Sequence, residues 1–236
     1  MRYKIASISH IFKPTVICVI CQHPHSQAFA VCNACRQLFM PIGPACRHCA
    51  QPLPDATFAV CGACCQKQPM LDHVFAAYQF EEPLRTLLHE FKYREGLYLT
   101  PFLAHLILKS LPNELTKTQC LIPVPLHQDR LQERGFNQAA ELAKHLSHKI
   151  NKPYQLSLCK KIKKTLPQAG LTAEQRKKNL NQAFQAMATC YQHVTLIDDL
   201  MTTGSTVNEL ARTLKNTGIK RVDVWCCARA VVQKFY

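Results

Sequence analysis

The sequence lacks three features that would each place it in a large class of proteins. No apolar run approaches the roughly 18 residues of a membrane-spanning helix. The basic N-terminal segment is interrupted by Lys13 and Pro14, and no small-residue cleavage site follows. Neither the P-loop motif G-x-x-x-x-G-K-[ST] nor the dinucleotide motif G-x-G-x-x-G occurs. We therefore expect a soluble cytoplasmic protein without membrane insertion. The missing motifs exclude nucleotide binding by a P-loop or by the dinucleotide motif.

Acidic residues are also scarce. The chain has 29 Lys and Arg against 15 Asp and Glu, a formal net charge of +14. Residues 120–190 hold twelve of the basic residues and only four acidic ones. Such a field attracts phosphates, on a nucleotide or along a nucleic acid such as single-stranded DNA. A basic surface that affects only solubility would have the same composition, so charge alone leaves the partner open.

Cysteine, in contrast, is abundant, with 14 residues. Without an export signal, this number favours metal binding over disulfides. Eight cysteines form four C-x-x-C motifs: Cys18, Cys21, Cys32, Cys35, Cys46, Cys49, Cys61 and Cys64. Two such turns complete the tetrahedral thiolate shell that Zn²⁺ favours, so four turns supply ligands for two ions. The sequence predicts two Zn²⁺ ions, each held by four cysteines.

The pairing of the four motifs stays open at this stage. Sequential pairing gives two stacked zinc ribbons, and interleaved pairing satisfies the same ligand count. Cys65 is an alternative ligand to Cys64, and three histidines are weaker candidates: His23, His25 and His48. Few large apolar residues separate the motifs, so we expect metal binding to supply most of the folding free energy of residues 1–70.

From residue 71 onward, patterns typical of strands and helices alternate. The expected strands are 73–80, 120–125, 155–162, 193–198 and 221–231, and the expected helices are 82–93, 97–111, 137–150 and 205–218. This alternation predicts an α/β domain, residues 71–236, with a mostly parallel sheet and flanking helices. A small zinc-ribbon domain, residues 1–70, precedes it. Ligands of such sheets bind beyond the carboxyl ends of strands.

The segment "LIDDLMTTGSTV" (196–207) lies at such a strand end. Asp198 and Asp199 close an apolar run, and a turn rich in hydroxyl groups leads into a helix. Gly204 lets the backbone approach a ligand closely, and the amides of residues 202–206 are suited to surround a phosphate at the positive end of the helix. Carboxylates accept hydrogen bonds from a ribose diol and also help to hold Mg²⁺.

This segment resembles the fingerprint of type I phosphoribosyltransferases, which bind phosphoribosyl pyrophosphate. Three further segments carry a more specific resemblance: "FKYREG" (91–96), "IPVPLHQDRLQERGFNQAAELAK" (122–144) and "KTLPQAGLTAEQRKKNLNQAF" (164–184). Together with the C-x-x-C motifs they resemble the ComF family, the ComFC and GntX proteins associated with DNA uptake in natural transformation. The resemblance runs from about Cys18 to Arg229 and implies a type I phosphoribosyltransferase-like sheet.

The resemblance also implies three groups of site residues. Ribose and 5′-phosphate, with Mg²⁺, would contact Asp198, Asp199, Met201, Thr202, Thr203, Gly204, Ser205 and Thr206. The pyrophosphate loop would include Leu126, His127, Arg130 and Arg134, and the flexible hood Lys163, Lys164, Gln168 and Arg176. Lys92 is a weaker candidate. For the basic residues of the loop and the hood, a solvated surface without a ligand remains the alternative.

Three functional hypotheses follow. The first is a protein that binds phosphoribosyl pyrophosphate and handles imported single-stranded DNA. The second is an active phosphoribosyltransferase on an unidentified acceptor, and the third is a zinc-ribbon scaffold for competence proteins. No segment recognisable as a base-binding loop indicates the acceptor, so the sequence leaves open whether the protein is an enzyme. Trp225, the single tryptophan, is expected in the core.

Overall fold

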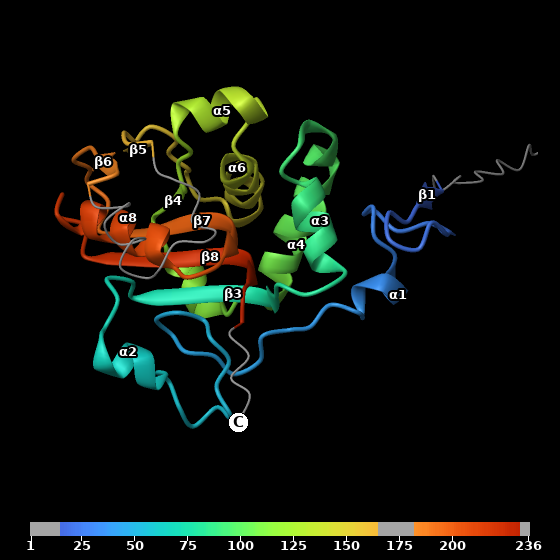
Figure 1. Cartoon of the computed structure of the whole chain (residues 1–236), viewed down its shortest axis with the longest axis horizontal. Helices are drawn as coiled ribbons and strands as arrows, with labels where there is room; N and C mark the ends of the chain where they lie inside the picture. Colours follow the sequence, from blue (N-terminus) through green and yellow to red (C-terminus); the bar gives the residue numbers. More distant parts are fainter. Residues whose placement is uncertain (1–14, 165–181, 232–236) are drawn as a thin grey trace, which may run out of the picture.

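The computed structural model describes residues 15–164 and 182–231. Its centre is a four-stranded sheet in the order β3-β8-β7-β4, in which every neighbouring pair is parallel (Figure 1). The strands are β3 (His73–Gln79), β4 (Cys120–Pro123), β7 (His193–Met201) and β8 (Arg221–Arg229). Consecutive residues are buried in both middle strands, Val194–Ile197 in β7 and Val222–Arg229 in β8, as expected where helices cover both faces of a parallel sheet. The predicted α/β class is confirmed.

The helices form a layer on each face of this sheet. One face, with Leu121, Ile197 and Trp225, packs against α3 (Leu84–Glu90), α4 (Thr100–Ser110) and α6 (Gln138–Ile150). The opposite face packs against α8 (Ser205–Lys215). Trp225 is fully buried, as the sequence predicts. Within the described ranges, no helix is both long and apolar enough to cross a bilayer.

Several elements differ from the sequence-based expectation. The helix expected over 97–111 is divided into a 3-10 turn, η1 (Arg94–Leu99), and α4, and a second 3-10 turn, η2 (Asn113–Lys117), follows. The strand expected over 155–162 is short, β5 (Cys159–Lys161), and pairs antiparallel with β6 (Phe184–Ala186) outside the central sheet. Helix α5 (Gln128–Arg134) has no buried residue, so it carries no apolar periodicity by which the sequence would reveal it.

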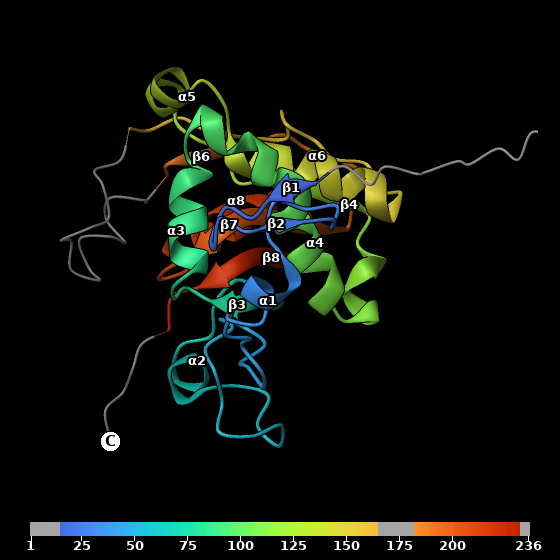
Figure 2. The same cartoon turned by 90° about the vertical axis from the view of Figure 1, so that its right-hand side faces the viewer.

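The cysteine-rich segment packs onto the α/β domain at two places. Its elements are β1 (Val16–Ile17), β2 (Pro24–His25), α1 (Asn33–Arg36) and α2 (Gly62–Gln66). The first half lies beside α4, where the ring of Phe29 is 5.8 Å from that of Phe102. The second half lies along the edge strand β3, where the amide of Val74 donates to the carbonyl of Arg47 at 2.6 Å (Figures 1 and 2). The domain boundary at residue 70 stays a prediction.

Candidate functional site

The eight cysteines of the C-x-x-C motifs form two compact clusters. Their members are Cys18, Cys21, Cys32 and Cys35 in the first, and Cys46, Cys49, Cys61 and Cys64 in the second. The sulfurs of each cluster lie within 4.8 Å of one another. Tetrahedral zinc with Zn–S bonds of about 2.3 Å would separate its sulfurs by about 3.8 Å. The Cys21–Cys32 pair at 3.8 Å and the Cys49–Cys61 pair at 3.6 Å fit this geometry.

The clusters answer the questions that the sequence left open about the ligands. The motifs pair sequentially, and Cys65 is exposed and stands outside both clusters, so Cys64 is the ligand. His48 is held by the carbonyl of Leu71 at 2.8 Å, and His23 by the carbonyl of Cys21 at 2.8 Å. None of the three nearby histidines joins a cluster. The prediction of two four-cysteine zinc sites is confirmed.

Each cluster contains one thiol that ionises readily. Burial of Cys18 opposes its ionisation, but backbone amides, chiefly those of Cys21 and Cys32, outweigh burial and lower its pKa to about 6. In the second cluster, burial of Cys61 is likewise outweighed, first by the amide of Cys64, and the pKa is lowered. Burial instead raises the pKa of Cys49 to about 12. Because zinc binds the thiolate, a lowered pKa favours metal binding at these two sulfurs.

The turn between β7 and α8 is built around Gly204. Its φ of +79° lies in the left-handed region that glycine adopts without strain, and its carbonyl accepts from the amide of Asn208 at 2.9 Å. The hydroxyls of Thr203 and Ser205 are 2.9 Å apart. A shallow hollow of about 30 Å³ lies here, lined by Asp198, Leu200, Met201, Thr202, Thr203, Gly204, Ser205, Thr206 and Val207. We call residues 201–206 the candidate phosphate loop, because it leads into the N-terminus of α8, the end of a helix that attracts anions.

The acid pair lies shortly before this loop, near the carboxyl end of β7. The carboxylate of Asp198 accepts from the amide of Asp199 at 2.9 Å. Burial raises the pKa of Asp198 well above its ordinary value, the charge of Asp199 raises it further, and the ammonium of Lys92 acts weakly in the opposite direction. A carboxylate under these conditions gains from a cation or from hydrogen-bond donors. The arrangement is therefore suited to bind hydroxyl groups or a metal ion.

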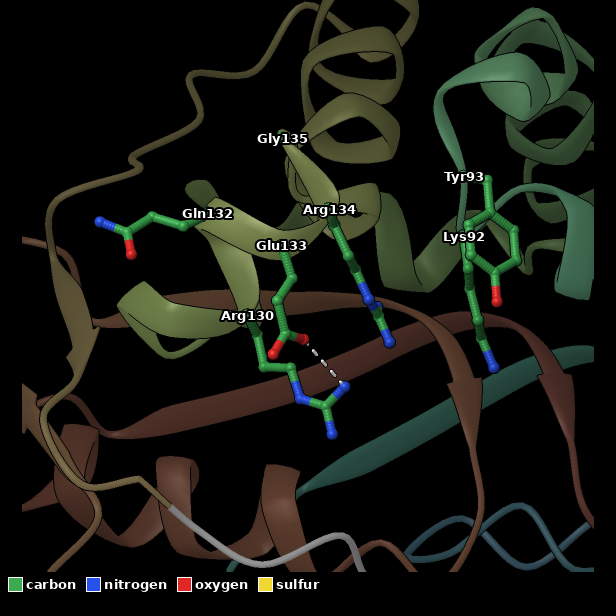
Figure 3. A pocket seen from close by; sticks show the side chains of 7 residues that line it. All are labelled: Lys92, Tyr93, Arg130, Gln132, Glu133, Arg134 and Gly135. Atoms are coloured by element: carbon green, nitrogen blue, oxygen red, sulfur yellow. Dashed lines mark hydrogen bonds and ion pairs between the residues drawn. The ribbon is translucent and has the colours of Figure 1, made fainter.

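A larger, basic hollow of about 590 Å³ lies beside α5. Its lining is Lys92, Tyr93, Arg130, Gln132, Glu133, Arg134 and Gly135. Figure 3 shows the side chains of Lys92, Arg130 and Arg134 pointing into the same space, with Arg130 3.3 Å from Glu133. Of these cations, Lys92 acts on the ionisation of Asp198. Three cations around one hollow can bind a multiply charged phosphate ligand.

One buried glutamine holds this basic hollow together. The side chain of Gln138 is 3% exposed; it accepts from Arg134 at 3.2 Å and donates to the carbonyl of Lys92 at 2.9 Å. It thus connects "FKYREG" with "RGFNQ", two segments about 40 residues apart in the chain. Sequence reasoning missed Gln138 and Tyr93, because a single glutamine or tyrosine has no spacing that signals its contacts.

Of the remaining sequence-predicted residues, those that the structure describes line neither hollow. His127 caps α5 by accepting from the amide of Asp129, and Leu126 precedes it; neither lines the basic hollow. The ammonium of Lys164 is 2.6 Å from Asp129, and Lys163 is exposed. Gln168 and Arg176 lie outside the described residues. The ligand contacts predicted for all these residues stay predictions.

Fold and clusters together define an α/β protein with an N-terminal double zinc ribbon, and the double zinc ribbon family model matches residues 8–65. Over 223 residues the chain is 32% identical to competence protein F of Haemophilus influenzae, covering 90% of this chain and 96% of that protein. It is 29% identical to the DNA utilization protein YhgH of Salmonella typhimurium (91% and 97% covered) and 28% identical to competence protein ComFC of Bacillus subtilis (86% and 90% covered). The chain belongs to this family of competence and DNA utilization proteins, so the resemblance to the ComF family is confirmed.

Proposed function

We propose that the protein binds phosphoribosyl pyrophosphate together with Mg²⁺ and uses this site in handling single-stranded DNA. One observation carries the proposal: the acid pair Asp198–Asp199 and the N-terminus of α8 meet at the carboxyl end of β7. That edge is where ligands of parallel sheets bind. The names of the relatives, competence protein F and DNA utilization protein YhgH, support the connection with DNA.

Each part of phosphoribosyl pyrophosphate has a complementary partner in this arrangement. The first amides of α8 and the hydroxyls of Thr203 and Ser205 are suited to the 5′-phosphate. Asp198 and Asp199 would accept hydrogen bonds from the ribose diol. The cations of the basic hollow, Lys92, Arg130 and Arg134, would then face the pyrophosphate.

The acid pair also fits a role in Mg²⁺ binding, since carboxylate oxygens are preferred ligands of this ion. Within the part of the chain that the structure describes, the two cysteine clusters are the groups of three or more potential metal ligands. Asp198 and Asp199 would therefore hold Mg²⁺ mainly through the ligand, whose phosphate oxygens and water would supply most of the coordination. Bound there, the ion would neutralise charge on the pyrophosphate.

Titration calorimetry with phosphoribosyl pyrophosphate and Mg²⁺ tests this proposal. The wild-type chain should bind, and Asp198→Ala/Asp199→Ala should bind at least about tenfold more weakly, because the ribose diol then has no carboxylate acceptors. Asp55→Asn changes an exposed acid near the second zinc site and is the matched control. Equal affinity in all three proteins would contradict the assignment, as would no heat with the wild type over the whole titration.

A separate observation favours single-stranded DNA as a second ligand. The basic hollow opens beside Tyr93, whose side chain is 65% exposed on the same rim as Arg134 (Figure 3). Proteins that bind single strands without sequence preference combine a basic groove with aromatic side chains on which bases stack. Segment 120–190, which contributes Arg130 and Arg134 to this hollow, has an excess of basic residues, and such an excess attracts phosphates.

Salt-dependent binding measures this second interaction. An oligothymidine should bind at low salt, and Arg130→Ala/Arg134→Ala should reduce the slope of log K against log salt by about 0.7 for each phosphate that is no longer neutralised. Tyr93→Ala should weaken binding by about 1–3 kcal/mol without changing the slope, because stacking involves no counterions. Lys149→Ala, at the end of α6, is the control. Identical slopes in all variants would exclude the basic hollow as the strand-binding surface.

The two alternative functions are separated by turnover and by partner binding. An active phosphoribosyltransferase would release pyrophosphate when the correct acceptor is added, and single-stranded DNA and free bases are the first acceptors to examine. A zinc-ribbon scaffold would bind competence proteins equally well when Asp198 and Asp199 are replaced. Ligand binding without pyrophosphate release would favour a binding protein over an enzyme.

A further inference from the structure

We propose that Arg229 couples the second zinc site to the candidate phosphate loop, so that zinc bound to Cys46, Cys49, Cys61 and Cys64 holds the loop in its ligand-binding conformation. The first zinc site has no such effect. The consequence for phosphoribosyl pyrophosphate rests on the proposed function, whereas the coupling itself does not.

Arg229 is a buried cation bound to carbonyl groups from both regions. It ends β8 and is 4% exposed. Its Nε donates to the carbonyl of Cys49 at 2.7 Å, and its Nη1 to the carbonyls of Met201 at 3.1 Å and Ala230 at 2.8 Å. The carbonyl of Thr202 accepts from the same Nη1. A buried guanidinium without such partners would be strongly destabilising, so Arg229 holds these four carbonyls in a fixed arrangement.

On the zinc side, Arg229 contacts the backbone of a ligand residue. The sulfur of Cys49 belongs to the second cluster. The amides of Cys49 and Ala50 donate to the carbonyl of Cys46 at 3.3 and 2.7 Å, and Ala50 has a φ of +54°. Zinc bound to both sulfurs holds this tight turn closed. It therefore fixes the direction of the Cys49 carbonyl that accepts from Arg229.

On the loop side, Arg229 contacts the residues that lead into Gly204. Met201 is the register partner of Arg229 in the sheet, and the carbonyl of Met201 also accepts from the amide of Ala230 at 3.0 Å. Thr202 follows directly, so its carbonyl is fixed only two residues before Gly204. The orientation of the first amides of α8 depends on the backbone at this point.

The chemistry of arginine explains why one residue connects the two sides. A guanidinium is a planar fork whose Nε and Nη atoms donate in different directions, whereas a lysine ammonium is a point charge. Lysine at position 229 would reach one group of carbonyls and leave the other without its donor. The first zinc site is attached differently: Arg36 lies 3.1 Å from the ring of His105 in α4 and donates to the side chain of Asn33 at 3.3 Å.

The coupling can be measured without any ligand. The chain has seven glycines, so selective ¹⁵N-glycine labelling gives a simple amide spectrum. In Arg229→Lys and in Cys61→Ser we expect the Gly204 signal to shift or broaden. Gly218, which follows the other end of α8, and Gly135 should keep their signals and report on folding. Arg36→Lys is the matched control and should leave Gly204 unchanged. Zinc content is measured for each protein.

Binding of phosphoribosyl pyrophosphate provides a second readout. We expect about tenfold weaker binding in Arg229→Lys and Cys61→Ser, within the usual range of coupling between sites. An unchanged Gly204 signal in either Arg229→Lys or Cys61→Ser, with Gly218 in place, would overturn the coupling. If Cys61→Ser loses the Gly135 and Gly218 signals by unfolding, Arg229→Lys decides, because it keeps every zinc ligand. If the wild type binds no phosphoribosyl pyrophosphate, the proposed function fails, and the Gly204 signal still decides the coupling.

Discussion

Asp198→Asn is expected to stabilise the free protein by about 1 kcal/mol, as mutations that relieve an unfavourable functional site often do. On the proposed function, the same change should weaken binding of phosphoribosyl pyrophosphate at least about tenfold, because asparagine lacks the charge that would hold Mg²⁺ and the diol. The physical reason for the gain in stability is that burial and the neighbouring Asp199 make the Asp198 carboxylate unfavourable and raise its pKa. Thermal unfolding and calorimetry on the same preparations measure both effects.

The pH dependence of stability distinguishes this explanation from a local packing change. A carboxyl group whose pKa is raised on folding holds its proton more tightly in the folded state. The carboxylate therefore begins to lower the free energy of unfolding as pH rises above about 3.9, the pKa of this group in the unfolded chain. The loss of stability is complete above the pKa of the group in the folded protein. The stability gain of Asp198→Asn should grow over that interval. A gain that is constant with pH would show that the acid pair is not its cause.

Asp223 is the matched contrast, since this carboxyl group is fully buried but has hydrogen-bond donors around it. Burial raises its pKa, but hydrogen bonds from His193 at 2.8 Å and Arg221 at 3.0 Å outweigh burial and lower it. A lowered pKa stabilises the folded protein at pH above the pKa that the carboxyl group has in the unfolded chain. This stability is lost as pH falls through the pKa of the group in the folded protein. Asp223→Asn should therefore destabilise the protein at neutral pH. If both substitutions changed stability in the same direction, the assignment of opposite roles would be wrong.

Removal of zinc is expected to unfold the cysteine-rich segment. Zinc binding to small ribbon-like sites provides on the order of 10 kcal/mol, and residues 15–70 have few large apolar side chains to replace it. The purified protein should contain two Zn²⁺ per chain. After chelation, limited proteolysis should cleave within residues 15–70, while the sheet from β3 to β8 persists. If residues 15–70 stayed resistant to the protease in metal-free protein, this expectation would be wrong.

Single cysteine variants identify the ligands in the same experiment. Cys64→Ser should lose one of the two Zn²⁺ ions, because serine replaces one of the four thiolates of its cluster. Cys65→Ser and Cys190→Ser replace exposed cysteines outside the clusters and should retain both ions. Loss of zinc in Cys65→Ser with full retention in Cys64→Ser would reverse the ligand assignment of these neighbours.

The sequence was most informative where chemistry depends on local spacing. The C-x-x-C motifs place two sulfurs on one turn, so the two zinc sites could be predicted without knowledge of the fold. The apolar runs at 193–198 and 221–231 indicated buried parallel strands, and the acid pair was then placed at a strand end. Helix α5 and the β5–β6 hairpin were not predictable in this way, because an exposed helix and a three-residue strand carry little periodic signal.

The amino-acid sequence by itself thus determined the four metal-binding motifs, the α/β class and the position of the acid pair before a hydroxyl-rich turn. Only the tertiary structure decided that the motifs pair sequentially with Cys64 as a ligand, that Gln138 joins Arg134 to Lys92, and that Arg229 lies between the second zinc site and the candidate phosphate loop. Spacing along the chain reports on contacts a few residues apart. Arg229 and Cys49 are separated by 180 residues, and they meet because the cysteine-rich segment packs along β3, the neighbour of β8 in the sheet.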